Sequence, residues 1–377
     1  MNSTGAGIRT AVRLLPPLVD ITSPVALGDL ALPNRLVMAP LTRTRAGAAG
    51  VPGALVAEHY AQRASVGLIV AEGTYPSHES RSYPGQPGLV TDEQQEGWRG
   101  VAEAVHAAGG RIVVQLMNGG RVSHTDITGT DRIVGPSAVA IAGEAHTADG
   151  KKPYPVPHAL TEAEIPGVVA EFVAAARRAV DAGLDGVEIH SANGYLLHQF
   201  LAPGANHRTD SYGGSPQNRA RLAVEVTTAV AAEIGAGRVG IRISPAHNIQ
   251  DALETDPADV EATYAHLVEA LAPLGLAYLS VLHADPAGEF VQGLRKRFGG
   301  PLMVNSGFAQ VTTREEVAGY LADGAADVVA VGRAVMANPD LLERWTGGHP
   351  ENELDPTTSY GQGAAGYTDY PFLTPRA

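Results

Sequence analysis

The sequence predicts an α/β fold, a closed (β/α)8 barrel in which eight parallel strands alternate with helices. Short apolar runs recur eight times along the 377 residues, and segments with helical periodicity lie between them. The composition does not change between the two halves, which favours one closed barrel over an open, doubly wound sheet. Hydrophobic residues make up 44% of the chain and charged residues 18%, so the chain can bury a large core.

The eight apolar runs are the predicted strands. They are nearly continuous rather than alternating, which is typical of parallel strands covered on both faces. They occupy residues 35–39, 67–72, 111–116, 184–190, 239–244, 276–282, 301–306 and 327–332.

Capping signals mark where the helices begin and end. A Thr followed three residues later by Gln or Glu predicts a capping box, and glycine after an apolar stripe predicts a helix end. Helix starts are predicted at Thr91 with Gln94, Thr161 with Glu164, Thr312 with Glu315, and Asp256 before a proline; ends are predicted at Gly109, Gly183 and Gly324.

The predicted domain organisation is one barrel with additions. Residues 1–20 have no sustained apolar run and are expected to form a loose N-terminal arm, whereas residues 21–377 form the barrel. Two connections are longer than a compact domain needs: the insertion 117–160 and the glycine-rich tail 347–377. Both are predicted to be lids on the C-terminal face, where the long loops of such barrels lie.

Composition excludes several classes of function. Lys and Arg number 27 against 40 Asp and Glu, a net charge of −13, which argues against nucleic-acid binding. There is no cysteine, so disulfides, thiolate metal sites, iron–sulfur clusters and a cysteine nucleophile are excluded. The histidines show no metal-ligand spacing, and no metal is predicted. Without a membrane-length apolar run or a signal peptide, a cytoplasmic protein is expected.

Catalytic groups of such barrels come from the C-terminal ends of strands. The fourth strand is followed by HSANGY, in which His190 and Asn193 can both donate to one oxygen and Tyr195 can supply a proton. These residues are suited to polarise a carbonyl group and protonate its neighbour. The alternative is that the histidine is a structural donor and the tyrosine only covers the strand end.

A phosphate site is predicted at the ends of the last two strands. Ser306 and Gly307 follow the seventh strand, and Gly332 and Arg333 follow the eighth. Glycines allow a close backbone approach to an anion, and a guanidinium matches phosphate geometry. Alternatively, these glycines only turn the chain.

Two further polar groups lie within apolar strands. Arg242 must meet a carboxylate such as Glu72 or Glu188, or else an anionic ligand, because buried arginines are almost never unpaired. Gln115 offers both a donor and an acceptor, which suits the edge of a heterocycle.

Six segments closely resemble segments of the old yellow enzyme family and occur in the same order along the chain. Members of this family are FMN-dependent ene-reductases built on a (β/α)8 TIM barrel. The resemblance extends from about residue 22 to 373. It is carried by residues 34–46, 60–74, 113–124, 190–222, 239–245 and 366–373.

The resemblance implies roles for the strand-end residues in binding FMN. Thr42, with Pro40 before it, is similar to the threonine beside flavin N5, and Gly73 and Gln115 to contacts of the pyrimidine edge. Arg242 resembles the cation that faces the reduced flavin. The phosphate cradle corresponds to Ser306, Gly307, Gly332 and Arg333.

The resemblance also implies an activity. NADPH or NADH reduces FMN; hydride then passes from flavin N5 to the β-carbon of an activated alkene whose oxygen is held by His190 and Asn193. Tyr195 protonates the α-carbon, and Tyr360 lines the substrate cavity. Where many relatives have Gln-Leu-Trp-His, this chain has QLMN, so Met117 is expected to reshape the pocket.

Two alternative functions are left open: the first would use the same site residues, and the second would need no catalytic residue. The protein could be a dedicated biosynthetic FMN isomerase or desaturase acting on one natural product, or a barrel that only binds. The expected partner is a small-molecule activated alkene, with neither nucleic acid nor membrane, and the sequence leaves both monomer and homodimer open.

Overall fold

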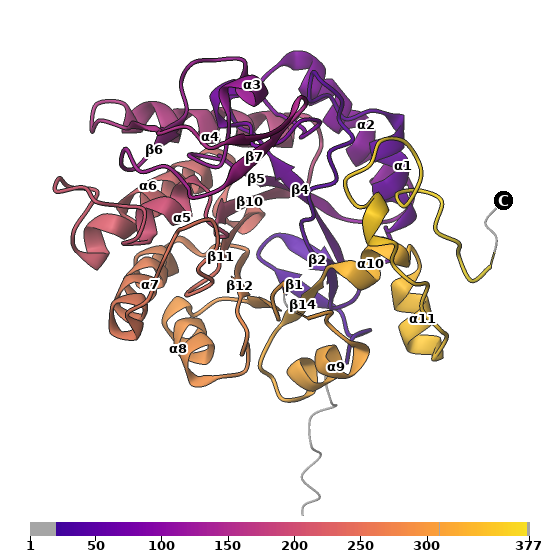
Figure 1. Cartoon of the computed structure of the whole chain (residues 1–377). Coiled ribbons are helices and arrows are strands. Elements are labelled where there is room, and N and C mark those ends of the chain that lie inside the picture. Colours follow the sequence, from indigo (N-terminus) through magenta and orange to yellow (C-terminus); the bar gives the residue numbers. More distant parts are fainter. Residues whose placement is uncertain (1–19, 309, 375–377) are drawn as a thin grey trace, which may run out of the picture.

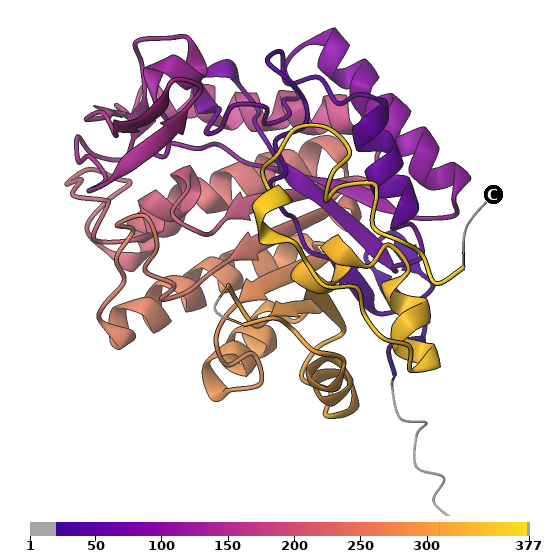
Figure 2. The ribbon, with the colours of Figure 1, turned by 45° about the vertical axis from the view of Figure 1, so that its right-hand side comes forward.

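The computed structural model describes residues 20–308 and 310–374; the predicted arm 1–20 lies almost entirely outside them. Eight parallel strands close into a barrel in the order β10-β11-β12-β13-β14-β3-β4-β5. Helices surround the strands (Figures 1 and 2). The predicted closed barrel is therefore confirmed, and the open-sheet alternative is excluded.

Every predicted apolar run forms one strand of the barrel. These strands are β3 (Leu36–Met38), β4 (Leu68–Thr74), β5 (Ile112–Leu116), β10 (Gly186–Ser191), β11 (Val239–Ile243), β12 (Tyr278–Leu282), β13 (Leu302–Asn305) and β14 (Val328–Val331). The principal helices are α1 (Ala54–Gln62), α2 (Asp92–Ala107), α4 (Ile165–Asp181), α5 (Leu196–Leu201), α6 (Pro216–Ile234), α7 (Pro257–Leu271), α8 (Glu289–Phe298), α9 (Arg314–Ala322), α10 (Arg333–Ala337) and α11 (Leu341–Gly347).

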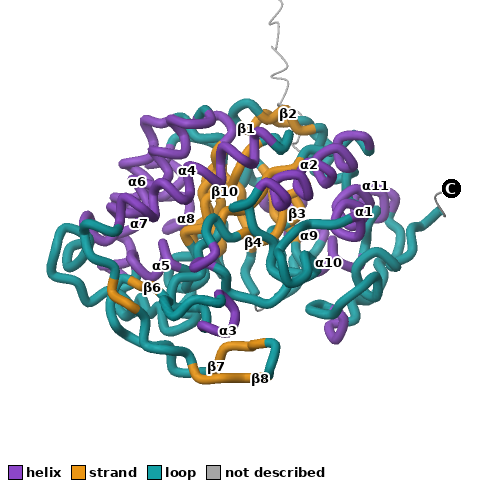
Figure 3. Tube along the Cα trace, turned by 90° about the horizontal axis from the view of Figure 1, so that it is seen from above, coloured by secondary structure: helices purple, strands orange, loops and turns teal. Residues whose placement is uncertain are grey.

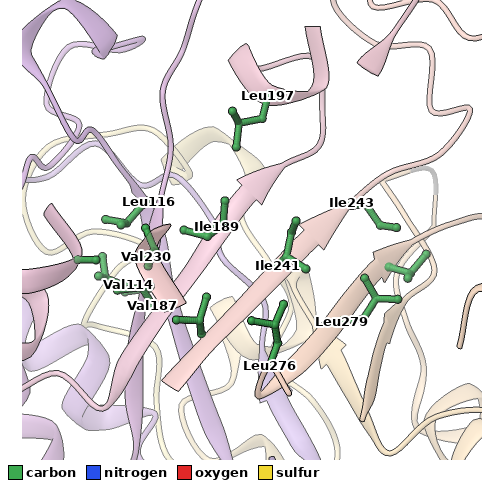
Figure 4. Packing of buried hydrophobic residues seen from close by; sticks show 14 of the residues in the cluster. Val114, Leu116, Val187, Ile189, Leu197, Val230, Ile241, Ile243, Leu276 and Leu279 are labelled. Atoms are coloured by element: carbon green, nitrogen blue, oxygen red, sulfur yellow. The ribbon is translucent and has the colours of Figure 1, made fainter. Parts of the chain in front are cut away.

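Strand residues alternate between two cores. Outward-facing residues pack against the helices; Ile189 and Ile241, for example, belong to the same cluster as Val230 of α6 (Figure 4). Inward-facing residues such as Val113, Tyr278 and Met303 fill the barrel interior. The antiparallel strands β1 (Val25–Leu27) and β2 (Leu30–Leu32) pack their leucines onto this inner core. They therefore close the N-terminal end of the barrel and leave the C-terminal end for the site.

The insertion 117–160 has secondary structure of its own. It contains α3 (Thr125–Thr128), an antiparallel pair of β7 (Glu144–Thr147) and β8 (Gly150–Pro153), and β6 (Val134–Gly135) paired with β9 (His158–Ala159). In Figure 3, β7 and β8 lie at the opposite end of the molecule from β1 and β2. The insertion thus extends from the C-terminal end of the barrel.

Most predicted helix boundaries are confirmed. Thr91 with Gln94 forms the capping box of α2, and Asp256 caps α7. The box predicted at Thr312 with Glu315 is wrong by one residue, because Thr313 with Glu316 caps α9. The Thr312 hydroxyl instead pairs with Ser306 at 2.8 Å.

The start of α4 differs from the predicted box in its chemistry. Glu164 accepts hydrogen bonds from both the amide and the hydroxyl of Thr161, but the Thr161 hydroxyl caps no backbone N–H. Within the described part of the chain, no helix combines the length and apolar character needed to cross a bilayer.

Candidate active site

Polar side chains gather inside the barrel at the C-terminal ends of its strands. Gln115 of β5, His190 of β10 and Arg242 of β11 alternate along their strands with residues of the outer core, so they face inward. Each is at most 3% exposed. The topology therefore brings together three residues that are spread over 127 positions of the sequence.

A β-bulge shapes one wall of this site. The register between β4 and β5 shifts between Ala71 and Thr74, so Gly73 lies in the irregular segment. A Cβ atom at Gly73 would lie 2.7 Å from the Met117 Sδ atom. The Gly73 carbonyl accepts a hydrogen bond of 2.9 Å from the Gln86 side chain. Met117 thus fills the space that the missing side chain leaves.

Arg242 has Glu188 as its counter-charge. Of the two carboxylates that the sequence offered, Glu72 instead accepts hydrogen bonds from the amides of Arg43 and Thr44. Burial lowers the pKa of Arg242, and the Glu188 carboxylate is the largest influence that raises it again. Among the described residues, Nε and Nη1 of Arg242 have no hydrogen-bond partner. These donors are free for an acceptor that enters the site.

His190 and Asn193 offer further polar atoms. Burial, followed by the charge of Arg242, lowers the pKa of His190 well below its usual value, so the imidazole is neutral at neutral pH. Asn193 has φ 56°, a left-handed conformation that asparagine tolerates better than most residues. Within the described chain, His190 Nδ1 and Asn193 Oδ1 lack hydrogen-bond partners.

Tyr195 lies against His190 and is held by a residue that the sequence did not reveal. The rings of His190 and Tyr195 meet edge to face with centroids 5.0 Å apart. The hydroxyl groups of Tyr83 and Tyr195 are 2.8 Å apart and share a hydrogen bond. Burial raises the pKa of Tyr195 to about 12, although the bond with Tyr83 lowers it somewhat. Tyr195 therefore keeps its proton at physiological pH.

Tyr83 carries no signal of its own in the sequence. It belongs to the irregular segment after β4, where neither periodicity nor a motif singles out a residue. Together with Tyr154 it packs against the cluster of Met117, Val122, Ile141 and Tyr195.

The predicted phosphate residues lie where β13 and β14 end. Gly307 has φ 98°, and its amide donates to the Asn305 side chain at 3.2 Å. Arg333 begins α10, and its guanidinium donates to the Phe308 carbonyl at 2.5 Å. This contact brings the loop after β13 next to the start of α10, so the four predicted residues lie in two adjacent strand-end segments.

Pro40 and Thr42 follow β3 in a segment that is tied to the C-terminal tail. Both are half-buried. The Thr44 hydroxyl donates to the Tyr360 carbonyl at 3.4 Å. The Tyr360 side chain itself is 73% exposed, and after burial and Tyr154 it is among the groups that raise the pKa of Tyr195. Tyr360 is therefore placed toward solvent at the edge of the site.

The residues present fit a flavin. Unpartnered buried donors on Arg242, the Gln115 side chain and the bulge at Gly73 face one end of the barrel, where a planar ring with donors and acceptors along its edge can be held. The segments that carry Gly307 and Arg333 present backbone and guanidinium donors to a phosphate.

Comparison with known proteins agrees with this geometry. Residues 20–352 match the model of the NADH:flavin oxidoreductase / NADH oxidase family. A probable flavin mononucleotide-dependent alkene reductase of Leishmania infantum is 43% identical over 93% of this chain and 96% of its own length.

Solved structures with the same fold are also similar in sequence. The old yellow enzyme homologue from Zymomonas mobilis has a TM-score of 0.89 and 40% identity, over 94% of this chain and all of that one. Morphinone reductase in complex with tetrahydroNAD has a TM-score of 0.88 and 45% identity, over 94% and 98% of the two chains. The chain therefore belongs to the NADH:flavin oxidoreductase / NADH oxidase family, that of the old yellow enzymes, and is a flavin oxidoreductase.

Proposed function

We propose that this protein is an FMN-dependent ene-reductase that uses NADPH or NADH. The observation that carries the proposal is the group of His190, Asn193 and Tyr195, whose buried polar atoms face the same barrel end as the residues suited to a flavin. Similarity to an alkene reductase and to a protein solved with a nicotinamide analogue supports the activity and the hydride donor.

FMN would be held at both of its ends. Gln115, Arg242 and the backbone of Gly73 would contact the pyrimidine side of the ring, with Pro40 and Thr42 near its reactive centre. Ser306, Gly307, Gly332 and Arg333 would hold the phosphate. When bound, FMN would supply the hydride-transfer chemistry that links NAD(P)H to the alkene.

The protein residues act on the alkene. Neutral His190 and the Asn193 amide hydrogen-bond the carbonyl or nitro oxygen of the substrate, on which negative charge develops during the reaction. Tyr195, protonated at neutral pH, donates a proton to the α-carbon. Met117 and Tyr360 border the space for the rest of the substrate.

The test is Tyr195→Phe, studied in two half-reactions under anaerobic conditions. Reduction of the flavin by NADPH or NADH should stay within about twofold of the wild type, because Tyr195 takes no part in it. Alkene reduction should slow by roughly 10²- to 10⁴-fold, the usual contribution of a general acid. Stopped-flow absorbance of the flavin measures both steps. Equal rates of alkene reduction in variant and wild type would remove Tyr195 from the mechanism.

A further inference from the structure

Glu188 is a buried carboxylate to which the proposed mechanism gives no role. It lies on β10 two residues before His190, so both side chains face the barrel interior. Its side chain is inaccessible to solvent, and it stands directly opposite Gln115 of β5 in the parallel register. It therefore lies beside Gln115, and one inward-facing position below His190 and Arg242.

One oxygen of Glu188 fixes the Gln115 amide. Gln115 Nε2 donates to Glu188 Oε1 at 2.8 Å, which leaves the Gln115 carbonyl oxygen on the other side of the amide group. Because an isolated amide can turn over, this bond determines which of its two polar atoms faces the barrel mouth. Glu188 thus decides whether Gln115 offers a donor or an acceptor there.

The Glu188 carboxylate also interacts electrostatically with Arg242 and lies near the Tyr278 hydroxyl. Among the described residues, Glu188 Oε2 has no hydrogen-bond partner. Burial raises the pKa of Glu188, and Arg242 is the largest influence that lowers it again. Gly240 stands opposite Glu188 on β11, and the Tyr278 ring occupies the place of its side chain, with a ring atom 2.2 Å from where a Cβ would be. Arg242 and Glu188 are both buried, so their charges interact away from water.

We infer that Glu188 is a positioning residue that orients Gln115 and balances the charge of Arg242, and thereby sets the reduction potential of the bound flavin. The inference rests on the proposed FMN site. A reduced flavin is more negative than an oxidised one, so Arg242 stabilises it and the carboxylate of Glu188 opposes that effect.

Two variants separate the two roles. Glu188→Gln keeps an oxygen that can accept from Gln115 but loses the charge, so it should favour the reduced flavin by roughly tenfold, a shift of about +30 mV in the two-electron midpoint potential. Glu188→Asp keeps the charge but shortens the reach to Gln115. Glu188→Asp should bind FMN roughly tenfold more weakly than the wild type. It should shift the midpoint potential by less than half of the shift expected for Glu188→Gln.

The matched control is Asp340→Asn, because Asp340 is also a buried carboxylate paired with a buried arginine, Arg344, at 2.6 Å. This pair lies at α11, outside the barrel. The control should lose stability but keep the wild-type potential. Spectroelectrochemical titration measures the potentials, and quenching of FMN fluorescence measures the affinities.

The outcomes are distinct. A wild-type protein that binds no reducible flavin overturns the proposed function and this inference together. If the flavin binds but Glu188→Gln leaves its potential unchanged, or Asp340→Asn shifts it as far, the inference alone is overturned.

Discussion

Tyr195 is oriented through its hydroxyl group, which bonds the Tyr83 hydroxyl and also interacts with the Gln250 side chain. The bond of 2.8 Å to Tyr83 is formed from the segment after β4, whereas Tyr195 follows β10. Tyr83 is half-buried and Tyr195 is buried, so Tyr83 is the outer member of the pair. If Tyr195 is the proton donor proposed above, it must recover a proton in every turnover, and the Tyr83 hydroxyl that shares its hydrogen bond would pass that proton on.

Tyr83→Phe tests this arrangement. Without the hydroxyl partner, alkene reduction should slow by about three- to thirtyfold, and reduction of the flavin by NADPH should not change. Stopped-flow measurement of both half-reactions, with a solvent isotope effect on the second, checks this. Tyr154→Phe is the control, since Tyr154 packs in the same cluster but forms no described bond with Tyr195. Equal effects of the two substitutions would reduce Tyr83 to a packing role.

For single residues, the sequence predicts which side chains belong to the site better than it predicts which residues they contact. His190, Gln115 and Arg242 could be identified because a parallel barrel places every strand end on one face. The partner of Arg242 could not be chosen between Glu72 and Glu188, since both lie on inner strands and only the three-dimensional arrangement separates them. Tyr83 was missed because its segment has no periodicity.

Among the elements, the part of the C-terminal tail around residues 358–366 is held by two arginines near Thr42. The Arg45 guanidinium donates to the carbonyls of Thr358, Ser359, Gly363 and Ala365 at 2.9–3.1 Å. Arg43 adds bonds to the carbonyls of Ser359 and Gly366. Tyr367 is buried between these arginines and His59, on which it stacks at 3.8 Å. The segment proposed to touch the flavin thus also anchors the segment that carries Tyr360.

Arg45→Ala should release the tail while the barrel stays folded. Loss of four backbone contacts should speed limited proteolysis between residues 355 and 370 by roughly tenfold or more, because each bond to a charged group contributes about 1.5–3 kcal/mol. Mass spectrometry locates the cuts. Arg45→Lys should behave similarly, since an ammonium group cannot reproduce the fork. Arg314→Ala, at an exposed position, is the control. Unchanged proteolysis in both Arg45 variants would contradict this anchoring.

Helix starts show where local sequence is ambiguous. The segment VTTREE offers two threonines and two glutamates at the same spacing, so both Thr312 with Glu315 and Thr313 with Glu316 satisfy the pattern. The structure uses the second pair because the Thr312 hydroxyl is bonded to Ser306. A contact within the loop after β13, between residues six positions apart, decides the register, and the capping-box pattern does not contain it.

For the whole molecule, the barrel was predictable because its strands are buried on both faces and appear as unbroken apolar runs. Boundaries of all eight agree with the structure to within a few residues. The internal structure of the insertion 117–160 was not predictable, since its strands have only two to four residues and β6 pairs with β9 more than twenty residues away.

Buried histidines should make the stability of the whole molecule depend on pH. Burial, and then Arg63, lowers the pKa of His59 well below its usual value of 6.5. The folded state therefore excludes a proton that the unfolded chain binds. The stability that comes from the neutral His59 is complete above pH 6.5 and is lost as the pH falls below this value.

The free energy of unfolding should accordingly decrease between pH 6.5 and 5, by up to about 1.4 kcal/mol per pH unit for each such histidine. Urea titrations of the wild type and of His59→Gln at several pH values measure this. The variant should have a lower free energy of unfolding than the wild type at pH 7, but this free energy should decrease less as the pH falls. His106→Gln, at an ion pair that is partly exposed, is the control. Parallel curves for wild type and His59→Gln would show that His59 does not carry the effect.

The contact between Gly73 and Met117 has a consequence for engineering this protein. A methyl group at position 73 would meet the Met117 sulfur, so any side chain at position 73 requires a smaller or displaced side chain at position 117. Substitutions at positions in contact are not additive. A library that randomises either position alone would sample mostly clashes or voids, whereas joint randomisation treats the bulge and its occupant as one design variable.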